Sequence, residues 1–274
     1  MTGQRFPKLK DRMPPFEHAV AATRGARDYQ EDTAAFLSDG GEPVVLSSEG
    51  PGYDRAGLAV LADGMGGHTG GALASQMVCD HFLQSASAAK GEVSERLIAG
   101  LGAANAALAT KIAENPLLAG MGSTLIGAAF SPLGVEWVSV GDSPLFLFRR
   151  GEVALLNEDH SLAPELDRMV AEGKLTAEEA RHDPRRHMLR SAVTGEEIDL
   201  LDVSRQPLKL EPGDYVVLAS DGIATLETNE IARLIQGYAK DGAAAVARAI
   251  IRSIEAIREP YQDNATVLVV RAVG

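Results

Sequence analysis

The sequence predicts an α+β fold, and two observations support this prediction. Short runs rich in Val, Leu and Phe, which are typical of β-strands, occur in clusters. Longer segments with apolar residues at helical spacing lie between the clusters, instead of alternating with single strands as in a parallel α/β fold. A chain of 274 residues can bury roughly 75% of its unfolded surface, so it needs no disulfide to hold a core. One large domain and two smaller ones are both compatible with this length.

The predicted elements follow from these patterns in chain order. Residues 1–15 carry several basic side chains and two adjacent prolines but no apolar core, which predicts a flexible N-terminal tail and not a secretory signal. The Gly-, Ser- and Pro-rich stretch 38–53 predicts a linker. The predicted strands are 17–23, 33–37, 57–62, 123–130, 134–140, 145–149, 152–156, 214–219 and 265–271. The predicted helices, each with one apolar stripe, are 71–84, 93–113 and 243–257.

Composition excludes several classes of function. The only cysteine, Cys79, cannot form an internal disulfide or a thiolate cluster, and a reducing, cytoplasmic compartment fits this best. With 26 basic and 38 acidic side chains, the net charge of −12 opposes nucleic acids and anionic membranes as partners and favours cations. The longest uncharged stretch, 115–135, is interrupted by glycines and a proline, so we expect no membrane helix there.

The aspartates at strand ends are the most informative feature. Predicted strands run into Asp63, Asp142 and Asp221, and each of these residues adjoins a glycine. Asp32 and Asp263 stand just before predicted strands. An Asp-Gly pair is a common turn and would by itself predict a hairpin. However, the first and third of these Asp-Gly pairs lead into a helix, so neither predicts a plain hairpin.

Carboxylates that meet at one edge of packed sheets need a compensating charge. A site built from carboxylates, without a His or Cys cluster, favours the hard cations Mg²⁺ or Mn²⁺. A calcium-binding module is the structural alternative, although no EF-hand spacing is present. Two hard cations can activate a water and hold phosphoryl oxygens for in-line attack, which predicts phosphoester hydrolysis. Arg27, near Asp32, would grip the phosphate, although taken alone it is typical of a surface arginine.

Seven short motifs then occur in an order that is typical of one family. They are Gly25-x-Arg27-x-x-Gln30-Glu31-Asp32, Ala62-Asp63-Gly64-Met65-Gly66-Gly67-His68, Met121-Gly122-Ser123-Thr124, Val140-Gly141-Asp142-Ser143, Asp159-His160-Ser161, Ala219-Ser220-Asp221-Gly222 and Asp263-Asn264-Ala265-Thr266. In these motifs the chain resembles, from about 23 to 270, the bacterial form of the metal-dependent Ser/Thr protein phosphatases of type 2C.

The resemblance implies a four-layer α-β-β-α sandwich with two antiparallel sheets and a cleft at one end. It implies a single phosphatase domain over 16–274, in which 161–195 is a mobile flap beside the cleft.

The resemblance also implies roles for individual residues. Two Mn²⁺ or Mg²⁺ ions would be held by Asp32, Asp63, the Gly64 carbonyl, Asp221 and Asp263. Arg27 would bind the substrate phosphate and would act in catalysis with Asp32 and Asp63. Glu31, Asp142 and Asn264 would support the ligands from outside the metal centre.

The sequence departs from the family pattern at several places. Met65 stands where the eukaryotic branch has a histidine that serves as general acid, so leaving-group protonation must come from elsewhere. Gln30 and Pro144 replace the more common Asn and Arg. The stretch 118–120 lacks the aspartate that helps bind a third metal in many bacterial members, so the sequence does not support a third ion.

The flap and two histidines leave alternatives open. The flap is predicted to contain a short helix that ends at Gly173, followed by a Thr176-x-x-Glu179 capping box. Four flap arginines either dock a phosphorylated or acidic partner or pair with Glu178, Glu179 and nearby acids; they are Arg181, Arg185, Arg186 and Arg190. His68 either helps near the metals or is a polar cap, and His160 either takes part in the chemistry or braces a loop; we expect the cap and the brace.

The sequence thus predicts a cytoplasmic, monomeric phosphatase that acts on phosphoserine and phosphothreonine in proteins, with a cognate Ser/Thr kinase as a further partner. The rival hypothesis is a catalytically silent member that binds a phosphoprotein without turnover. Retention of every ligand position and of Arg27 argues against the silent member.

Overall fold

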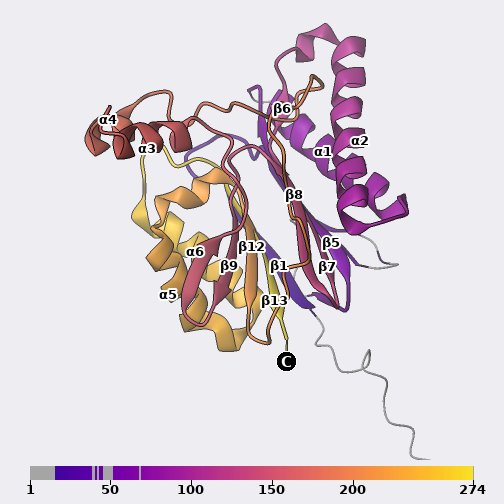
Figure 1. The fold of residues 1–274 in the computed structure, drawn as a ribbon, viewed down its shortest axis with the longest axis vertical. Helices are drawn as coiled ribbons and strands as arrows, with labels where there is room; N and C mark the ends of the chain where they lie inside the picture. The colour runs from indigo at the N-terminus through magenta and orange to yellow at the C-terminus, as the bar shows by residue number, and fades with distance from the viewer. Residues whose placement is uncertain (1–15, 39–40, 42, 46–51, 68, 274) are drawn as a thin grey trace, which may run out of the picture.

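The computed structural model describes residues 16–38, 41, 43–45, 52–67 and 69–273. Two antiparallel sheets stack face to face, and helices cover the outer face of each sheet (Figure 1). This arrangement confirms the predicted four-layer α-β-β-α sandwich. The predicted tail, residues 1–15, and His68 lie outside the described residues.

The first sheet has the strand order β10-β9-β12-β13-β1-β4. Its strands are β1 (Phe16–Thr23), β4 (Gly52–Asp54), β9 (Leu145–Arg149), β10 (Glu152–Leu155), β12 (Tyr215–Ala219) and β13 (Ala265–Ala272). Neighbouring strands are antiparallel. The central strands β12 and β13 are buried over nearly their whole length, because one face meets helices and the other meets the second sheet.

The second sheet has the strand order β11-β8-β7-β5-β2-β3, and the short β6 pairs with the end of β5. Its strands are β2 (Asp32–Ser38), β3 (Pro43–Val45), β5 (Gly57–Met65), β6 (Gly122–Ser123), β7 (Leu125–Ser131), β8 (Gly134–Val140) and β11 (Asp202–Val203). β5 pairs with β2 on one side and with β7 on the other, so it lies in the middle of the sheet.

Three apolar clusters hold the four layers together. Phe36, Leu61, Ile126, Leu218 and Leu268 belong to the cluster between the two sheets. The second sheet packs against α1 (Thr69–Ala88) and α2 (Val93–Glu114), and the first sheet packs against α5 (Thr228–Tyr238) and α6 (Ala243–Ile257). Short 3-10 helices are η2 (Pro116–Leu118), η3 (Asp221–Thr225) and η4 (Ala239–Asp241).

The structure agrees with most of the predicted elements. The predicted strand 123–130 is divided between β6 and β7, and β11 was not predicted. The prediction of a linker over 38–53 is wrong for its described residues, because β3 extends an edge of one sheet and β4 extends an edge of the other. The remaining residues of that stretch, 39–40, 42 and 46–51, lie outside the described part. Helix α5 was not among the predicted helices.

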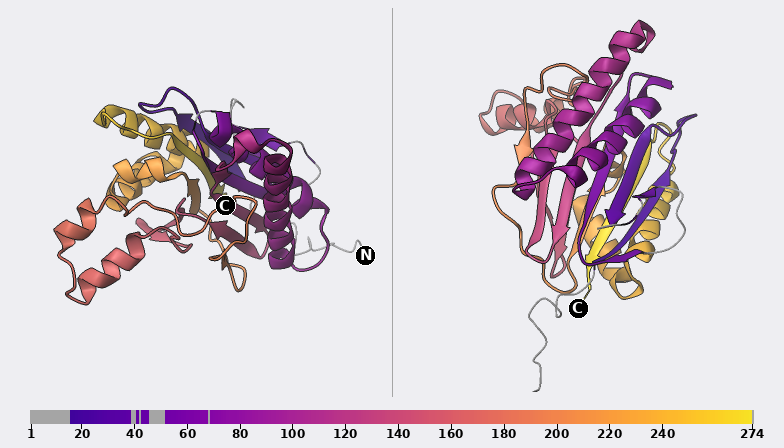
Figure 2. Two further views of the ribbon diagram at one scale, coloured as in Figure 1. Left: turned by 90° about the horizontal axis from the view of Figure 1, so that it is seen from above. Right: turned by 90° about the vertical axis from the view of Figure 1, so that its right-hand side faces the viewer.

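The predicted flap contains α3 (Ala163–Ala171) and α4 (Ala177–His182). Thr176 and Glu179 form the predicted capping box at the start of α4. Figures 1 and 2 show both helices outside the four layers, near one end of the sandwich. Among the helices that the structure describes, none combines the length and the apolar character needed to cross a bilayer.

Candidate active site

Five aspartates come together at one end of the sandwich. Asp32 begins β2 and is the register partner of Asp63 on β5, so the two side chains project from the same face of the second sheet. Asp221 and Asp263 come from the first sheet, after β12 and before β13. Asp63 interacts electrostatically with Asp32, Asp221 and Asp263. It also interacts with Asp142, which follows β8. The tertiary structure therefore joins the aspartates that the sequence places at strand ends.

Burial and mutual repulsion raise the pKa values of these carboxyl groups. Burial is the main cause for Asp32, whose pKa rises to about 6, and for Asp142, whose pKa rises to about 7. The pKa values of Asp63 and Asp221 are also raised, first by burial and then by neighbouring aspartates. Asp63 is close enough to Asp32 and Asp221 to affect the pKa of each of them. Carboxyl groups this close must share protons or a cation.

Three buried carboxylate oxygens in this region have no hydrogen-bond partner. They are Oε1 of Glu31 and the Oδ1 atoms of Asp32 and Asp221. An unpaired buried anionic oxygen is unfavourable, and such oxygens suit hard divalent cations. Within the described residues, no three His, Cys, Asp or Glu side chains form a group that could hold a metal ion as they stand. The unpaired carboxylate oxygens are nevertheless a donor set whose chemistry fits Mg²⁺ or Mn²⁺.

The backbone at Gly64 and Gly71 leaves no space for side chains. A Cβ atom at Gly64 would clash with the carbonyl oxygens of Gly71 and Glu31. A Cβ atom at Gly71 would clash with Oε1 of Glu31 and would lie 2.9 Å from the Gly64 carbonyl oxygen. The Gly64 carbonyl and the unpaired Glu31 oxygen are thus neighbours, and glycine at the start of α1 is what lets them approach.

Asn264 holds the loop that carries Arg27 and Glu31. Its buried side chain accepts a hydrogen bond from the Glu31 amide at 2.7 Å. It donates to the carbonyl oxygens of Arg24, at 3.0 Å, and Tyr29, at 2.9 Å. Since all three partners are backbone groups, Asn264 fixes the loop conformation.

Arg27 reaches the aspartate cluster through an ion pair. Its Nη2 lies 2.6 Å from Oδ2 of Asp263, and both side chains are substantially exposed. The guanidinium therefore points at the cluster from its solvent side, where it contacts a carboxylate that the sequence assigns to the metal.

The Met-Gly-Ser-Thr motif positions Asp63 through its backbone. Oγ1 of Thr124 accepts a hydrogen bond from the Asp63 amide at 3.0 Å. The Thr124 amide and the Ser123 hydroxyl both donate to the Asp63 carbonyl oxygen, at 2.9 and 2.8 Å. The motif match alone did not reveal this role, because the contact joins residues about sixty positions apart.

His160 braces a turn, as predicted. Its Nδ1 accepts a hydrogen bond from the Gly141 amide at 3.2 Å, next to Asp142. Burial lowers the pKa of His160, which favours the neutral ring that this bond requires. The His160 backbone also accepts from the Arg190 amide, so it ties the flap to the β8 turn.

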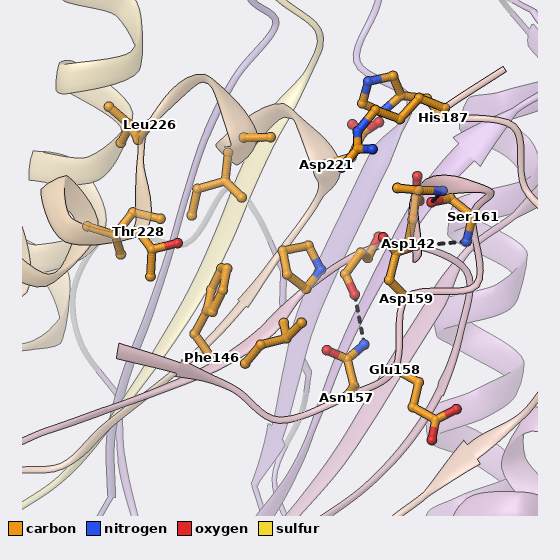
Figure 3. Close-up of a pocket in the computed structure, with 18 of the residues that line it drawn as sticks. Asp142, Phe146, Asn157, Glu158, Asp159, Ser161, His187, Asp221, Leu226 and Thr228 are labelled. Carbon is orange, nitrogen blue, oxygen red and sulfur yellow. Dashed lines mark hydrogen bonds between the residues drawn. The ribbon is translucent and has the colours of Figure 1, made fainter. Parts of the chain in front are cut away.

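A pocket of about 410 Å³ lies beside the aspartates (Figure 3). Asp142 and Asp221 form part of its wall, and Figure 3 shows His187 from the flap next to Asp221. Phe146 and residues of η3 and α5 form the apolar part. The sequence gives no sign of this pocket, because its walls come from β9, the flap and helix α5, which was not predicted.

Most of the flap arginines pair with acids inside the flap. Arg185 pairs with Asp183, at 2.7 Å, and Arg186 pairs with Asp167 through two hydrogen bonds of 2.8 and 2.9 Å. Arg190 lies 3.9 Å from Glu165. Pairing with nearby acids is therefore the better interpretation of these three arginines, although the acids are not Glu178 and Glu179.

Comparisons with known proteins agree with the motifs. A family model described as protein phosphatase 2C matches residues 51–256. The serine/threonine protein phosphatase PstP of Mycobacterium tuberculosis is 34% identical over 233 residues, which is 84% of this chain. That alignment covers 43% of the relative, so the chain spans less than half of its length.

Solved structures of related proteins share the fold. The crystal structure of the Mycobacterium tuberculosis PstP phosphatase has a TM-score of 0.74 at 30% identity, covering 95% of this chain and 100% of that one. A PstP catalytic domain in complex with two manganese ions has a TM-score of 0.72 at 29% identity, covering 95% and 99% of the two chains. The chain described here belongs to the protein phosphatase 2C family.

Proposed function

We propose that this chain hydrolyses phosphoserine and phosphothreonine on proteins in a metal-dependent reaction. The observation that carries the proposal is the aspartate cluster, in which buried carboxylate oxygens lack partners. Membership of the protein phosphatase 2C family supports the same chemistry.

We assign the cation-holding groups to one carbonyl and four carboxylates. They are the Gly64 carbonyl, Asp32, Asp63, Asp221 and Asp263, with Mn²⁺ or Mg²⁺ as the ion. Two bound ions would supply an activated water and positive charge for the phosphoryl oxygens. The related PstP domain with two manganese ions supports the number two. A third ion has no support here, because residues 118–120 offer no carboxylate.

The chain's own residues prepare the site in distinct ways. The Ser220 hydroxyl donates to Oδ2 of Asp32 at 2.7 Å, which leaves Oδ1 for another partner. Asn264 fixes the loop on which Arg27 sits. A substrate phosphate that binds Arg27 would compete with Asp263 for the Arg27 guanidinium. The Asp263 carboxylate would then be free to bind a cation.

The test is hydrolysis of an aryl phosphate and a phosphothreonine peptide with Mn²⁺, with Mg²⁺ and with EDTA. We expect turnover with either cation and none with EDTA, because carboxylates alone do not generate a nucleophile at neutral pH. Undiminished turnover in EDTA would contradict the proposal. Metal-dependent binding of the peptide without hydrolysis would support the silent member instead.

The natural substrates would be proteins phosphorylated on Ser or Thr, and the kinase that phosphorylates them would be a functional partner. We propose that the chain acts as a monomer in the cytoplasm. The only cysteine, Cys79, is buried and unpaired, which supports a reducing compartment.

A further inference from the structure

We infer that the pocket beside the aspartate cluster selects substrates with a lysine or arginine close to the phosphorylated residue. The inference rests on the proposed phosphatase function and specifies its substrate class. Three features of the pocket support it: its position, its apolar floor and the balance of charge on its walls.

The pocket begins at the aspartate cluster and extends toward α5 (Figure 3). Asp142 and Asp221 belong to both the cluster and the pocket wall. A phosphoresidue at the cluster would therefore place its sequence neighbours at the pocket mouth. Extended peptide advances about 3.3–3.6 Å per residue, so side chains within about three positions can enter.

The floor of the pocket is apolar. Phe146, Ile223, Leu226 and Ile231 line it, and each is at least nine-tenths buried in the core of the first sheet. Because these side chains already pack on each other, they form a fixed surface. Such a surface suits the aliphatic stem of lysine or arginine, which commonly lies along apolar residues while its charged end stays polar.

The walls carry an excess of negative charge. Besides the cluster aspartates, Glu158, Asp159 and Glu227 line the pocket. Figure 3 shows Asp159 on the side of the pocket opposite Leu226 and Thr228. A cationic side chain in the pocket would meet several carboxylates of its wall.

The basic residues of the wall offset this charge only in part. Arg186 uses both of its terminal nitrogens to bind Asp167, so its charge is already compensated. His187 is the other basic residue of the wall. An acidic substrate side chain would thus be repelled by the pocket, whereas a basic one would be complementary.

The experiment compares phosphothreonine peptides that differ at one position, tested at each of the three positions on either side of the phosphoresidue. The variable residue is lysine, norleucine, alanine or glutamate, and kcat/KM is measured with Mn²⁺. At one of these positions we expect kcat/KM for the lysine peptide to exceed that for the alanine peptide by about fivefold and that for the glutamate peptide by more. We expect the difference to arise from KM. Equal kcat/KM for the lysine and glutamate peptides would overturn the inference. A norleucine peptide as good as the lysine peptide would also overturn it, and so would a higher kcat/KM for the glutamate peptide.

Variants connect the preference to the pocket. Glu227→Gln should reduce the preference for lysine about twofold, and Glu227→Lys should abolish it, because the charge that attracts the substrate is lost and then reversed. Both should leave turnover of p-nitrophenyl phosphate unchanged, since that substrate has no peptide flank. Glu114→Gln, at the exposed end of α2 in the opposite outer layer, is the matched control and should change neither rate. Unchanged lysine preference in Glu227→Lys would contradict this assignment.

Two controls separate this inference from the proposed function. If the wild-type chain with Mn²⁺ fails to hydrolyse p-nitrophenyl phosphate, the proposed function fails. Fluorescence anisotropy of the labelled lysine and glutamate peptides does not depend on turnover, so it still decides the pocket's preference. Tighter binding of the glutamate peptide, or equal binding of both, would reject the pocket inference alone.

Discussion

The aspartate cluster and the flap both contain aspartates, but the pKa values of these residues shift in opposite directions. In the cluster, burial raises the pKa of Asp32 to about 6 and that of Asp142 to about 7. In the flap, hydrogen bonds from Arg185 lower the pKa of Asp183 to about 2, and hydrogen bonds from Arg186 lower that of Asp167. The shifts differ in sign because Asp167 and Asp183 each accept hydrogen bonds from an arginine, whereas the cluster acids are buried and face one another.

Carboxylates therefore serve two different purposes in the flap and in the cluster. A flap acid with a neighbouring arginine is satisfied within the chain and helps hold two short helices together. The cluster acids leave unpaired oxygens inside the protein, so their compensating charge must come from outside. Mutation, metal removal and changes of pH test whether this contrast holds.

Removing one cluster charge should have the largest effect on activity. We expect Asp63→Asn or Asp221→Asn to lower the rate at limiting Mn²⁺ by on the order of 10² or more, because a lost ligand weakens cation binding. The same variants should unfold at a higher temperature than the wild type in EDTA, since one like-charge repulsion is gone. Asp80→Asn, an exposed change on α1, is the matched control for both measurements. A wild-type rate at limiting metal in either cluster variant would remove that residue from the proposed ligand set.

Arg27 is the cation that touches the cluster, and its loss should have the next largest effect. Arg27→Ala should lower kcat/KM by roughly 1.5–3 kcal/mol in transition-state stabilisation, the range for hydrogen bonds to a charged group. Arg27→Lys should recover only part of this, because an ammonium cannot reproduce the two-pronged guanidinium contact. Metal titrations should show no loss of Mn²⁺ affinity in Arg27→Ala, since the ion pair with Asp263 is released. Unchanged kcat/KM would identify Arg27 as a surface residue.

The pH dependence of stability should differ between the metal-free and metal-loaded protein. The raised pKa values of Asp32 and Asp142 mean that the folded state binds more protons than the unfolded state between about pH 4 and 7. The contribution of these groups is therefore present at low pH and is lost as the pH rises through 6 to 7. We expect the melting temperature in EDTA to fall between pH 5 and 8, and saturating Mn²⁺ to cancel or reverse that fall. A melting temperature in EDTA that rises over this range would contradict the proposed repulsion.

The smallest effect is expected in the flap. Asp167→Asn should lower the free energy of unfolding by at most about 1 kcal/mol, because the pair with Arg186 is at the surface. Turnover of p-nitrophenyl phosphate should stay the same. The lysine preference of the pocket should weaken, since the uncompensated Arg186 would add positive charge to its wall. An Asp167→Asn variant that loses activity on the aryl phosphate would show that the flap acts in the chemistry itself.

Most of the architecture and the members of the aspartate cluster could be predicted from sequence patterns. Strand and helix periodicity depend on neighbouring residues, so the ends of β9 and α6 agree with the predicted 145–149 and 243–257. The seven motifs pointed to the family because they preserve local turns beside strands. Helix α5 escaped prediction, since it is short and only Ile231 and Ile235 are fully buried on it.

The tertiary structure alone decided how the side chains meet. Arg27 and Asp263 are 236 positions apart, and Ser220 binds Asp32 across 188 positions, so no local pattern carries these contacts. The pocket likewise depends on how β9, the flap and α5 pack together. Local periodicity reports which residues are buried, whereas the partner of each buried polar group is set by the long-range packing of the layers.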